Sequence, residues 1–310
     1  MSNNTEASSE HPKPEQITIV IPTLNEEEAI GTVIDEIKQC GFNNILVVDG
    51  HSTDNTVKIA REKGAKVITQ LGQGKAAAIK TAIQHVKTPY MLIMDADHTY
   101  DPKDIPKLLN IAPQYDQVIG LRTNRQNIPL LHRIGNQIIS TTISLLTGQR
   151  IKDPCSGMYL LKTDIAKNLE LTSTDFDIEA EIATQIATLG KIAETPINYR
   201  KRIGNPKLPT WKAGIQILTT AIKIAWLYNP IFLLSALAST LTIPGLTILL
   251  WQLYQRYIYG AKTWSIGWTW LGLVLTITGL QAFTTATITL LLKRMERRII
   301  QALSRKTGET

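Results

Sequence analysis

The sequence has little cysteine, since only Cys40 and Cys155 occur among its 310 residues. Two cysteines exclude a disulfide framework and a zinc site built from cysteines alone. Hydrophobic residues make up 44% of the chain, and this much apolar surface excludes a wholly disordered protein. The length predicts about two domains, or one domain with an appendage.

Acidic residues are nearly absent from the second part of the chain. Residues 200–310 contain 14 Lys plus Arg and 2 Asp plus Glu, whereas residues 1–199 contain 19 and 24. A strongly basic segment binds either nucleic acid or anionic lipid. Residues 224–255 and 263–292 between the basic clusters carry no charge at all. Membrane lipid is therefore the expected partner, and nucleic acid is not.

Both charge-free runs exceed the roughly 20 apolar residues that cross a bilayer as a helix. Two membrane spans are predicted, at Pro230 to Leu253 and at Ile266 to Leu292, with a kink at Pro244-Gly245. Basic residues flank the pair on one side, and the connector holds only Arg256 and Lys262. The positive-inside rule then places both termini and the preceding domain in the cytoplasm, in a two-span protein of the cell membrane.

The regions around the spans complete the expected organisation. Apolar residues recur at helical spacing from Trp211 to Ala225, which predicts an amphipathic helix on the inner leaflet. Small residues such as Gly272 and Gly279 favour close packing between spans, and a homo-oligomer is one expected result. The predicted units are a disordered tail (1–16), a folded domain (17–208), the interfacial helix (209–228), the two spans (229–293) and a basic cytosolic tail (294–310).

The first part of the chain alternates short β-branched runs with helical patterns. The predicted strands are Ile17–Ile21, Ile45–Val48, Lys66–Thr69, Tyr90–Met94 and Gln117–Gly120, and the predicted helices are Glu27–Gln39, Asp54–Glu62, Lys75–Val86 and Asp104–Ile111. This alternation indicates an α/β fold, Rossmann-like, with helices on both faces of a mostly parallel sheet. Ligands of such sheets bind beyond the carboxyl ends of the strands.

Polar residues follow three of these strands. Pro22 to Glu26 follow the first, Asp49 to Asp54 the second, and Asp95-Ala96-Asp97 the fourth. A carboxylate at Asp49 can accept hydrogen bonds from a base or ribose. Paired carboxylates at a strand end can hold a hard cation that neutralises a pyrophosphate. The segment Gly72 to Ala77 also matches a loose dinucleotide fingerprint, but it follows the third strand rather than the first, which disfavours a dehydrogenase.

Taken in order, these segments form a set of motifs. They are Ile19 to Glu26, Val47 to Thr56, Gly74-Lys75 and Met94 to Asp97, followed by Gly120-Leu121-Arg122, Arg133, Asp153 to Gly157, Phe176 with Glu179, and Tyr199 to Lys207. The set resembles the family 2 glycosyltransferases of the GT-A fold over residues 17–210. Its later motifs resemble the dolichyl-phosphate mannosyltransferase branch, which includes polyprenyl-phosphate transferases with two membrane spans after the catalytic domain.

The resemblance implies inverting, metal-dependent transfer of a hexose from a nucleotide sugar to a polyprenyl (dolichyl-type) phosphate at the cytoplasmic membrane face. It implies donor binding by Pro22, Thr23, Asn25, Glu26, Asp49, Lys75, Asp95 and Ala96, with Mg²⁺ or Mn²⁺ on Asp95 and Asp97. It implies binding of the acceptor phosphate by Arg122, Arg133, Ser156, Arg202 and Lys207. The catalytic residues would be Asp97, Arg122, Arg133 and Arg202.

Two departures from the family pattern leave the donor and the third metal ligand open. Asp49-Gly50-His51 stands where many relatives have two consecutive aspartates, and Thr99 stands where a glutamine is typical. UDP-glucose, UDP-N-acetylhexosamine and GDP-mannose all remain candidates, with a UDP-sugar favoured. The alternative functions are a processive family 2 polysaccharide synthase, whose Gln-x-x-Arg-Trp signature is absent, and a non-enzymatic membrane adaptor. Glu179 and Glu181 are expected on a partly exposed helix face, and the alternative for Glu179 is that it orders the acceptor loop.

Overall fold

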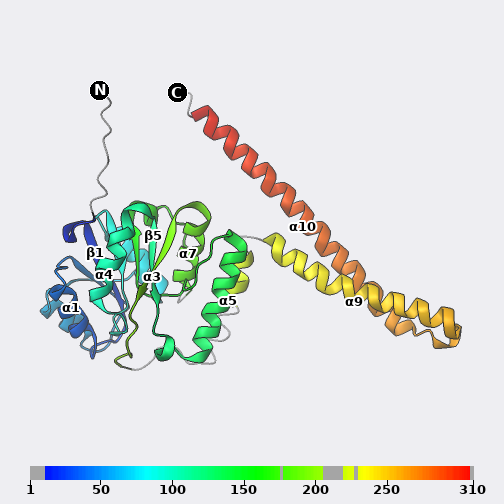
Figure 1. Ribbon diagram of the computed structural model, residues 1–310, viewed down its shortest axis with the longest axis horizontal. Coiled ribbons are helices and arrows are strands. Elements are labelled where there is room, and N and C mark those ends of the chain that lie inside the picture. The colour runs from blue at the N-terminus through cyan, green and yellow to red at the C-terminus, as the bar shows by residue number, and fades with distance from the viewer. Residues whose placement is uncertain (1–10, 175–176, 205–218, 227–229, 308–310) are drawn as a thin grey trace. The chain divides into compact units, whose positions relative to one another are not determined.

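The structure is a computed structural model, and it describes residues 11–174, 177–204, 219–226 and 230–307 (Figure 1). The chain divides into two compact units, Met1–Ile222 and Lys223–Thr310. Lys207 and most of the predicted interfacial helix lie outside the described residues, although residues 219–226 are helical. Pro14–Gln16, predicted as the end of a disordered tail, form a 3-10 turn, in which the Gln16 amide donates to the Lys13 carbonyl and the Lys13 amide donates to the Gln16 side chain.

The first unit contains a seven-stranded sheet in the order β3-β2-β1-β4-β6-β5-β7. The strands are β1 (Ile17–Thr23), β2 (Ile45–Asp49), β3 (Lys66–Thr69), β4 (Tyr90–Ile93), β5 (Gln117–Arg122), β6 (Tyr159–Lys162) and β7 (Ile192–Ile197). Every neighbouring pair is parallel except the two that include β6. The start of β6 therefore lies at the same edge of the sheet as the ends of the other strands.

Among the described residues between 11 and 204, seven α-helices accompany this sheet. They are α1 (Ile30–Gln39), α2 (Thr56–Glu62), α3 (Lys75–His85), α4 (Ile105–Ile111), α5 (Leu130–Thr147), α6 (Thr163–Lys167) and α7 (Ile178–Leu189), with 3-10 turns at Pro102–Asp104, Ala112–Gln114 and Arg125–Asn127. The mostly parallel α/β sheet predicted from the alternation is confirmed. All the predicted strands and helices are present, although α1 and α2 begin later than predicted and β1 and β5 end later.

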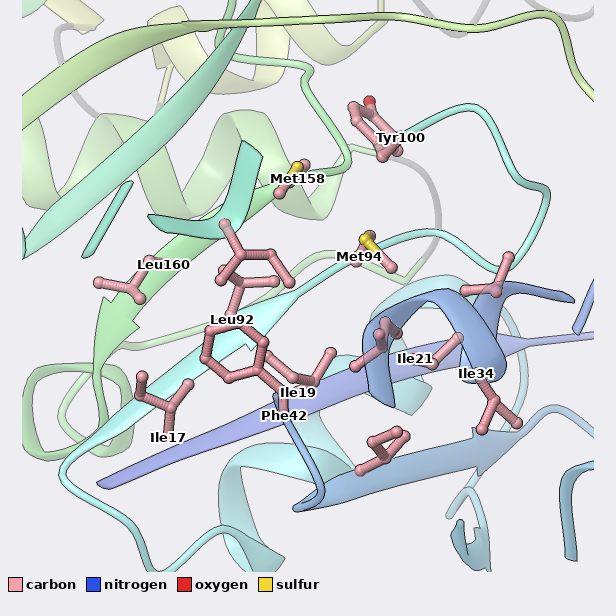
Figure 2. Close-up of a cluster of buried hydrophobic side chains, with 14 of the residues drawn as sticks. Ile17, Ile19, Ile21, Ile34, Phe42, Leu92, Met94, Tyr100, Met158 and Leu160 are labelled. Atoms are coloured by element: carbon pink, nitrogen blue, oxygen red, sulfur yellow. The ribbon is translucent and has the colours of Figure 1, made fainter. Parts of the chain in front are cut away.

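The core lies between the sheet and the helices α1, α2 and α4. Figure 2 shows alternate residues of β1, namely Ile17, Ile19 and Ile21, in one cluster with Ile34 of α1 and Leu92 of β4. Alternate residues of a strand point to opposite faces, so their neighbours face the other layer. Val20 and Ile93 are just as buried there. Burial on both faces makes this sheet a rigid base for the loops at its edge.

The second unit is a helical hairpin of α9 (Pro230–Tyr259) and α10 (Ile266–Thr307), joined by a 3-10 turn at Ala261–Thr263. Two segments are long and apolar enough to cross a membrane, Leu233–Tyr259 and Ile266–Leu292. The first helix runs through Pro244 without a break.

Small residues bring α9 and α10 together. A Cβ added to Gly279 would lie 2.7 Å from the Thr242 amide nitrogen, and one added to Gly272 would lie 3.1 Å from the Gly245 carbonyl oxygen. Gly272 and Gly279 thus pack between the two spans, as their small size predicts. The homo-oligomer remains a prediction that these two residues do not support.

Candidate active site

The candidate residues gather where the parallel strands end. Thr23 ends β1 and pairs in register with Asp49, which ends β2. Asp95 and Asp97 follow β4, and Arg202 follows β7. This edge is where open α/β sheets bind their ligands. The polar residues that the sequence places after separate strands therefore lie in one region of the first unit.

The loops after β1 and β2 hold each other in place. The Asp49 carboxylate, which is 4% exposed, accepts hydrogen bonds from the amides of His51 (3.1 Å) and Ser52 (3.2 Å). The Asn25 side chain accepts from the Thr53 amide at 2.7 Å, and the Asn25 backbone has a positive φ of 50°. An Asn tolerates this left-handed conformation better than most residues do. Two expected donor residues thus shape the loops in which they occur.

Three further donor candidates differ in how far they reach the surface. The Thr23 hydroxyl is buried and has no hydrogen-bond partner in the described part of the chain, which leaves it available to a ligand. Pro22 is partly buried beside it. Ala96 packs in the hydrophobic core at 3% exposure, so its side chain supports the Asp95 and Asp97 loop from below.

Lys75 joins two carboxylates. Its ammonium lies 2.6 Å from Asp95 Oδ1 and 2.6 Å from Glu179 Oε1. Burial would lower the pKa of Lys75, but the two carboxylates raise it well above its ordinary value, so the lysine is a cation. Burial raises the pKa of Glu179, and Lys75 opposes that shift.

The expectation that Glu179 and Glu181 belong to a partly exposed helix face is wrong. They are 4% and 3% exposed. The sequence does contain a signal for their burial, since the two acids lie among apolar residues in the first turns of α7. Acidic side chains are rarely buried unless they are paired, so such acids need partners.

Asp97 and Glu26 share one arginine. Arg202 donates to Asp97 Oδ2 at 2.7 Å and also bonds the Glu26 carboxylate. The other oxygen of Asp97 accepts from the Thr99 hydroxyl at 2.5 Å. Burial, followed by the nearby Asp95 charge, raises the pKa of Asp97. Thr99, which replaces the typical glutamine, thus orients Asp97.

The segment after β7 delivers Arg202 to this site. It runs along the loop after β4, with the Arg200 amide donating to the Thr99 carbonyl (2.7 Å) and the Ile203 amide donating to the Asp97 carbonyl (3.1 Å). Arg200 itself pairs with Glu36 at 2.8 Å, away from the aspartate pair. Of the neighbouring basic residues 200 and 202, Arg202 is the one that contacts Asp97.

Arg122 is the last residue of β5, and the buried Asp153 holds its side chain. Its Nε and Nη2 donate to the two oxygens of Asp153 at 2.8 and 2.6 Å, and its guanidinium lies over the Tyr199 ring, 5.3 Å from the centroid. Although burial lowers the pKa of Arg122, the surrounding acidic groups raise it well above the ordinary value. Asp153 thus fixes the orientation of the permanently charged Arg122 guanidinium, near the start of the segment that carries Arg202.

The remaining acceptor candidates are placed less directly. Arg133, in the first turns of α5, donates to the Ile128 carbonyl at 2.8 Å. Ser156 is 1% exposed, and its hydroxyl contacts the backbone of Met158. Lys207 lies outside the described residues. Arg122 and Arg202 are therefore the two acceptor candidates with described contacts to acidic residues at the strand ends.

The residues at this edge fit a divalent cation. Asp95 and Asp97 supply carboxylate oxygens, which are the ligands that Mg²⁺ and Mn²⁺ prefer. In this structure, Lys75 contacts Asp95 and Arg202 contacts Asp97. Among the described residues, no group of three or more His, Cys, Asp or Glu forms a metal site. A cation held by one or two carboxylates is completed by substrate phosphates and water, which suits a nucleotide-binding site.

Comparison with known proteins identifies the family. The model of the family described as glycosyl transferase family 2 matches residues 18–169. The chain is 34% identical to glycosyltransferase AglJ of Haloferax volcanii over 252 residues, which cover 79% of this chain and 83% of the relative. It is also 34% identical to a dolichyl-phosphate hexose transferase of the same organism, over 68% of this chain and 94% of the relative.

Solved structures agree on the fold. Glucosyl-3-phosphoglycerate synthase from Mycobacterium tuberculosis, in complex with Mn²⁺ and UDP-glucose, superposes with a TM-score of 0.57 and 21% identity. The match covers 67% of this chain and 78% of that structure. Because the family and the relatives are glycosyltransferases, the alternative of a non-enzymatic membrane adaptor is excluded. The chain thus belongs to glycosyl transferase family 2, and it is a glycosyltransferase with a GT-A fold.

Proposed function

We propose that this enzyme transfers a hexose from a nucleotide sugar to a polyprenyl phosphate, with inversion at the anomeric carbon. The reaction takes place at the cytoplasmic face of the cell membrane, to which the two apolar helices anchor the chain. A UDP-sugar is the favoured donor, and GDP-mannose is the second choice.

The donor binds at the ends of β1, β2 and β4. The loops that Asn25 and Asp49 organise hold the nucleoside, and the unpartnered Thr23 hydroxyl offers it a hydrogen bond. Asp95 and Asp97 would hold Mg²⁺ or Mn²⁺ on the pyrophosphate, where the bound cation would supply positive charge that stabilises the departing nucleoside diphosphate. The Mn²⁺ and UDP-glucose bound by the similar synthase structure support this assignment within the same fold.

The acceptor needs no general base, because a polyprenyl monophosphate is already an anion at neutral pH. The enzyme must instead bring two anions together, the acceptor phosphate and the donor pyrophosphate. Arg122 and Arg202 supply planar cations for the incoming phosphate, and the buried Asp153 keeps the first of them oriented. Positioning and charge neutralisation then account for the catalysis, and direct displacement inverts the anomeric centre.

The observation that carries the proposal is the contact between Arg202 and Asp97. An acceptor-side cation bonds a donor-side carboxylate at 2.7 Å, so the residues assigned to the acceptor phosphate and to the donor pyrophosphate are adjacent in one site. Two apolar helices in the same chain support a lipid acceptor. The 34% identity to a dolichyl-phosphate hexose transferase supports the same class of acceptor.

Transfer of radiolabel tests the proposal. The purified full chain receives labelled UDP-glucose, UDP-N-acetylglucosamine or GDP-mannose with polyprenyl phosphate and Mn²⁺ or Mg²⁺. We expect acid-labile label in the organic phase from one donor, with the opposite anomeric configuration to that donor. Label in a large water-soluble polymer would favour the processive synthase, and no lipid label from any donor with a folded protein would refute the proposal.

Two aspartate variants separate catalysis from folding. Asp97→Asn should abolish transfer, because it removes the carboxylate charge next to Arg202. Asp104 is a matched control, since it is 2% exposed but bonds Lys107 and the Asn198 amide. Asp104→Asn should lower stability and keep transfer. Equal activity in the two variants would contradict the assigned role of Asp97.

A further inference from the structure

Three elements distant in sequence meet at the Lys75 ammonium. Lys75 is the first residue of α3, Asp95 follows β4, and Glu179 lies in the first turn of α7. Both carboxylates lie 2.6 Å from the lysine nitrogen. Their side chains are 26% exposed for Asp95, 15% for Lys75 and 5% for Glu179. Asp95 is therefore the member of this triad that solvent, or a ligand, reaches best.

The charges of the triad do not cancel. One ammonium faces two carboxylates, so the group keeps one net negative charge. Without Glu179, Lys75 and Asp95 would form a neutral pair, and a neutral pair attracts a divalent cation weakly. Because Glu179 is buried and Asp95 is not, the excess negative charge is available at Asp95.

Asp95 is also held from its other side. A Cβ added to Gly157 would collide with the Asp95 carboxylate, lying 2.6 Å from its Cγ. The Gly157 amide in turn donates to the Tyr100 hydroxyl at 2.7 Å. The carboxylate is thus confined between the Lys75 ammonium and the Gly157 backbone, and a weaker hold on Lys75 would release it.

We propose that Glu179 is a positioning residue of the donor site. It holds Lys75 between two carboxylates, keeps Asp95 in place, and leaves on Asp95 the negative charge that binds the divalent cation of the donor. The inference rests on the proposed function in one respect, namely that the donor is a metal-bound nucleotide sugar. Glu179 itself touches neither the metal nor the donor.

The competing explanation is that Glu179 only satisfies a buried charge. Glu181 distinguishes the two, because it is buried to the same degree in the same helix. Its carboxylate accepts from the Thr172 amide (3.0 Å), the Thr172 hydroxyl (2.6 Å) and the Ser173 amide (2.8 Å). These bonds stabilise the loop before α7, so Glu181→Gln reports the cost of losing a buried carboxylate away from Asp95.

Calorimetric titration of the full chain with Mn²⁺ in the presence of UDP tests the proposal without turnover. Groups that orient metal ligands typically change metal affinity by about 10–100-fold when removed. We expect Glu179→Gln to weaken Mn²⁺ binding by about tenfold or more, and Glu179→Asp to recover part of that loss. Glu181→Gln should lower the melting temperature and leave the Mn²⁺ affinity at the wild-type value.

A double variant gives the sharpest result. Lys75→Gln combined with Glu179→Gln removes one charge of each sign, so Asp95 again carries the only net charge of the triad. The double variant tests the charge part of the inference, because it restores the net negative charge at Asp95 without Glu179. It should bind Mn²⁺ more tightly than Glu179→Gln alone, and no recovery would overturn the statement that the charge left on Asp95 sets the affinity. Removing both buried partners also avoids an unpaired buried charge, so this variant folds more readily than one that leaves such a charge.

The outcomes separate the inference from the function on which it rests. Wild-type Mn²⁺ affinity in Glu179→Gln, or equal losses in Glu179→Gln and Glu181→Gln, would overturn the inference and leave the proposed function intact. Failure of the wild-type chain to bind Mn²⁺ with UDP would overturn the proposed donor step together with the inference. In steady-state assays, the KM for polyprenyl phosphate should stay unchanged in Glu179→Gln.

Discussion

Removal of the Asp153 carboxylate should destabilise the catalytic domain more than any surface charge change. Asp153 is 2% exposed, and it accepts two side-chain hydrogen bonds from Arg122, at 2.8 and 2.6 Å. Asp153→Asn leaves the guanidinium of Arg122 buried without its counter-charge. Breaking a buried pair from one side costs about 3–5 kcal/mol, because the remaining charge has lost the water that would solvate it.

Chemical unfolding of the full chain in detergent measures this loss, with Asp35→Asn as the control. Asp35 pairs with Lys63 at the surface, where their side chains are 43% and 41% exposed. Exposed pairs contribute about 0–1 kcal/mol, so the control should barely change the unfolding midpoint. Equal losses in Asp153→Asn and Asp35→Asn would refute the reasoning from burial.

The double change Arg122→Met with Asp153→Leu completes this test. Replacing both buried ions by apolar side chains is often neutral or stabilising, so stability should return toward the wild-type value. Transfer to polyprenyl phosphate should remain lost, because the acceptor site has lost a cation. Recovery of both stability and transfer would show that Arg122 has no role in acceptor binding.

Further predictions concern a glycine of the site, an acid of the sheet edge and the hairpin. Gly157→Ala should lower the free energy of unfolding by about 1–3 kcal/mol, because the added Cβ displaces the Asp95 carboxylate. The same displacement should weaken Mn²⁺ binding, and unchanged Mn²⁺ affinity would contradict this reasoning. Although burial raises the pKa of Asp116, hydrogen bonds from the Lys191 amide and Lys162 lower it below its ordinary value of 3.8. The stabilisation from Asp116 is then present above pH 3.8 and lost as the pH falls through the lowered pKa, so Asp116→Asn should flatten the stability curve in that range. Gly279→Leu should separate α9 from α10 and lower the melting temperature of the hairpin, measured by circular dichroism. An unchanged melting temperature would contradict the close contact between Gly279 and Thr242.

Much of the fold is predictable from local pattern. The runs at Ile17, Ile45, Lys66, Tyr90 and Gln117 appear as strands because each is short, apolar or β-branched, and bounded by turn residues. The strand β6 is also short and apolar and follows the turn residues of Asp153 to Gly157, yet it pairs antiparallel with β4 and β5. That pairing depends on neighbours that are distant in sequence, so the local pattern does not predict it.

The candidate site divides in the same way. That the residues after β1, β2 and β4 meet follows from the rule for parallel sheets, and the structure confirms that placement. The bonding partners do not follow from it. Asp97 bonds an arginine 105 residues away, and Lys75 bonds Glu179, which the sequence suggests is partly exposed.

The sequence by itself determined the family, the α/β alternation, the aspartates at a strand end and the two apolar helices, because each depends on the order and type of neighbouring residues. Only the tertiary structure decided which charges pair. Lys75 lies between two carboxylates, Arg202 bonds Asp97, and the buried Asp153 holds Arg122. Charge pairing depends on distances of a few ångström and on burial, and both are set only when strands and helices from the whole domain pack together.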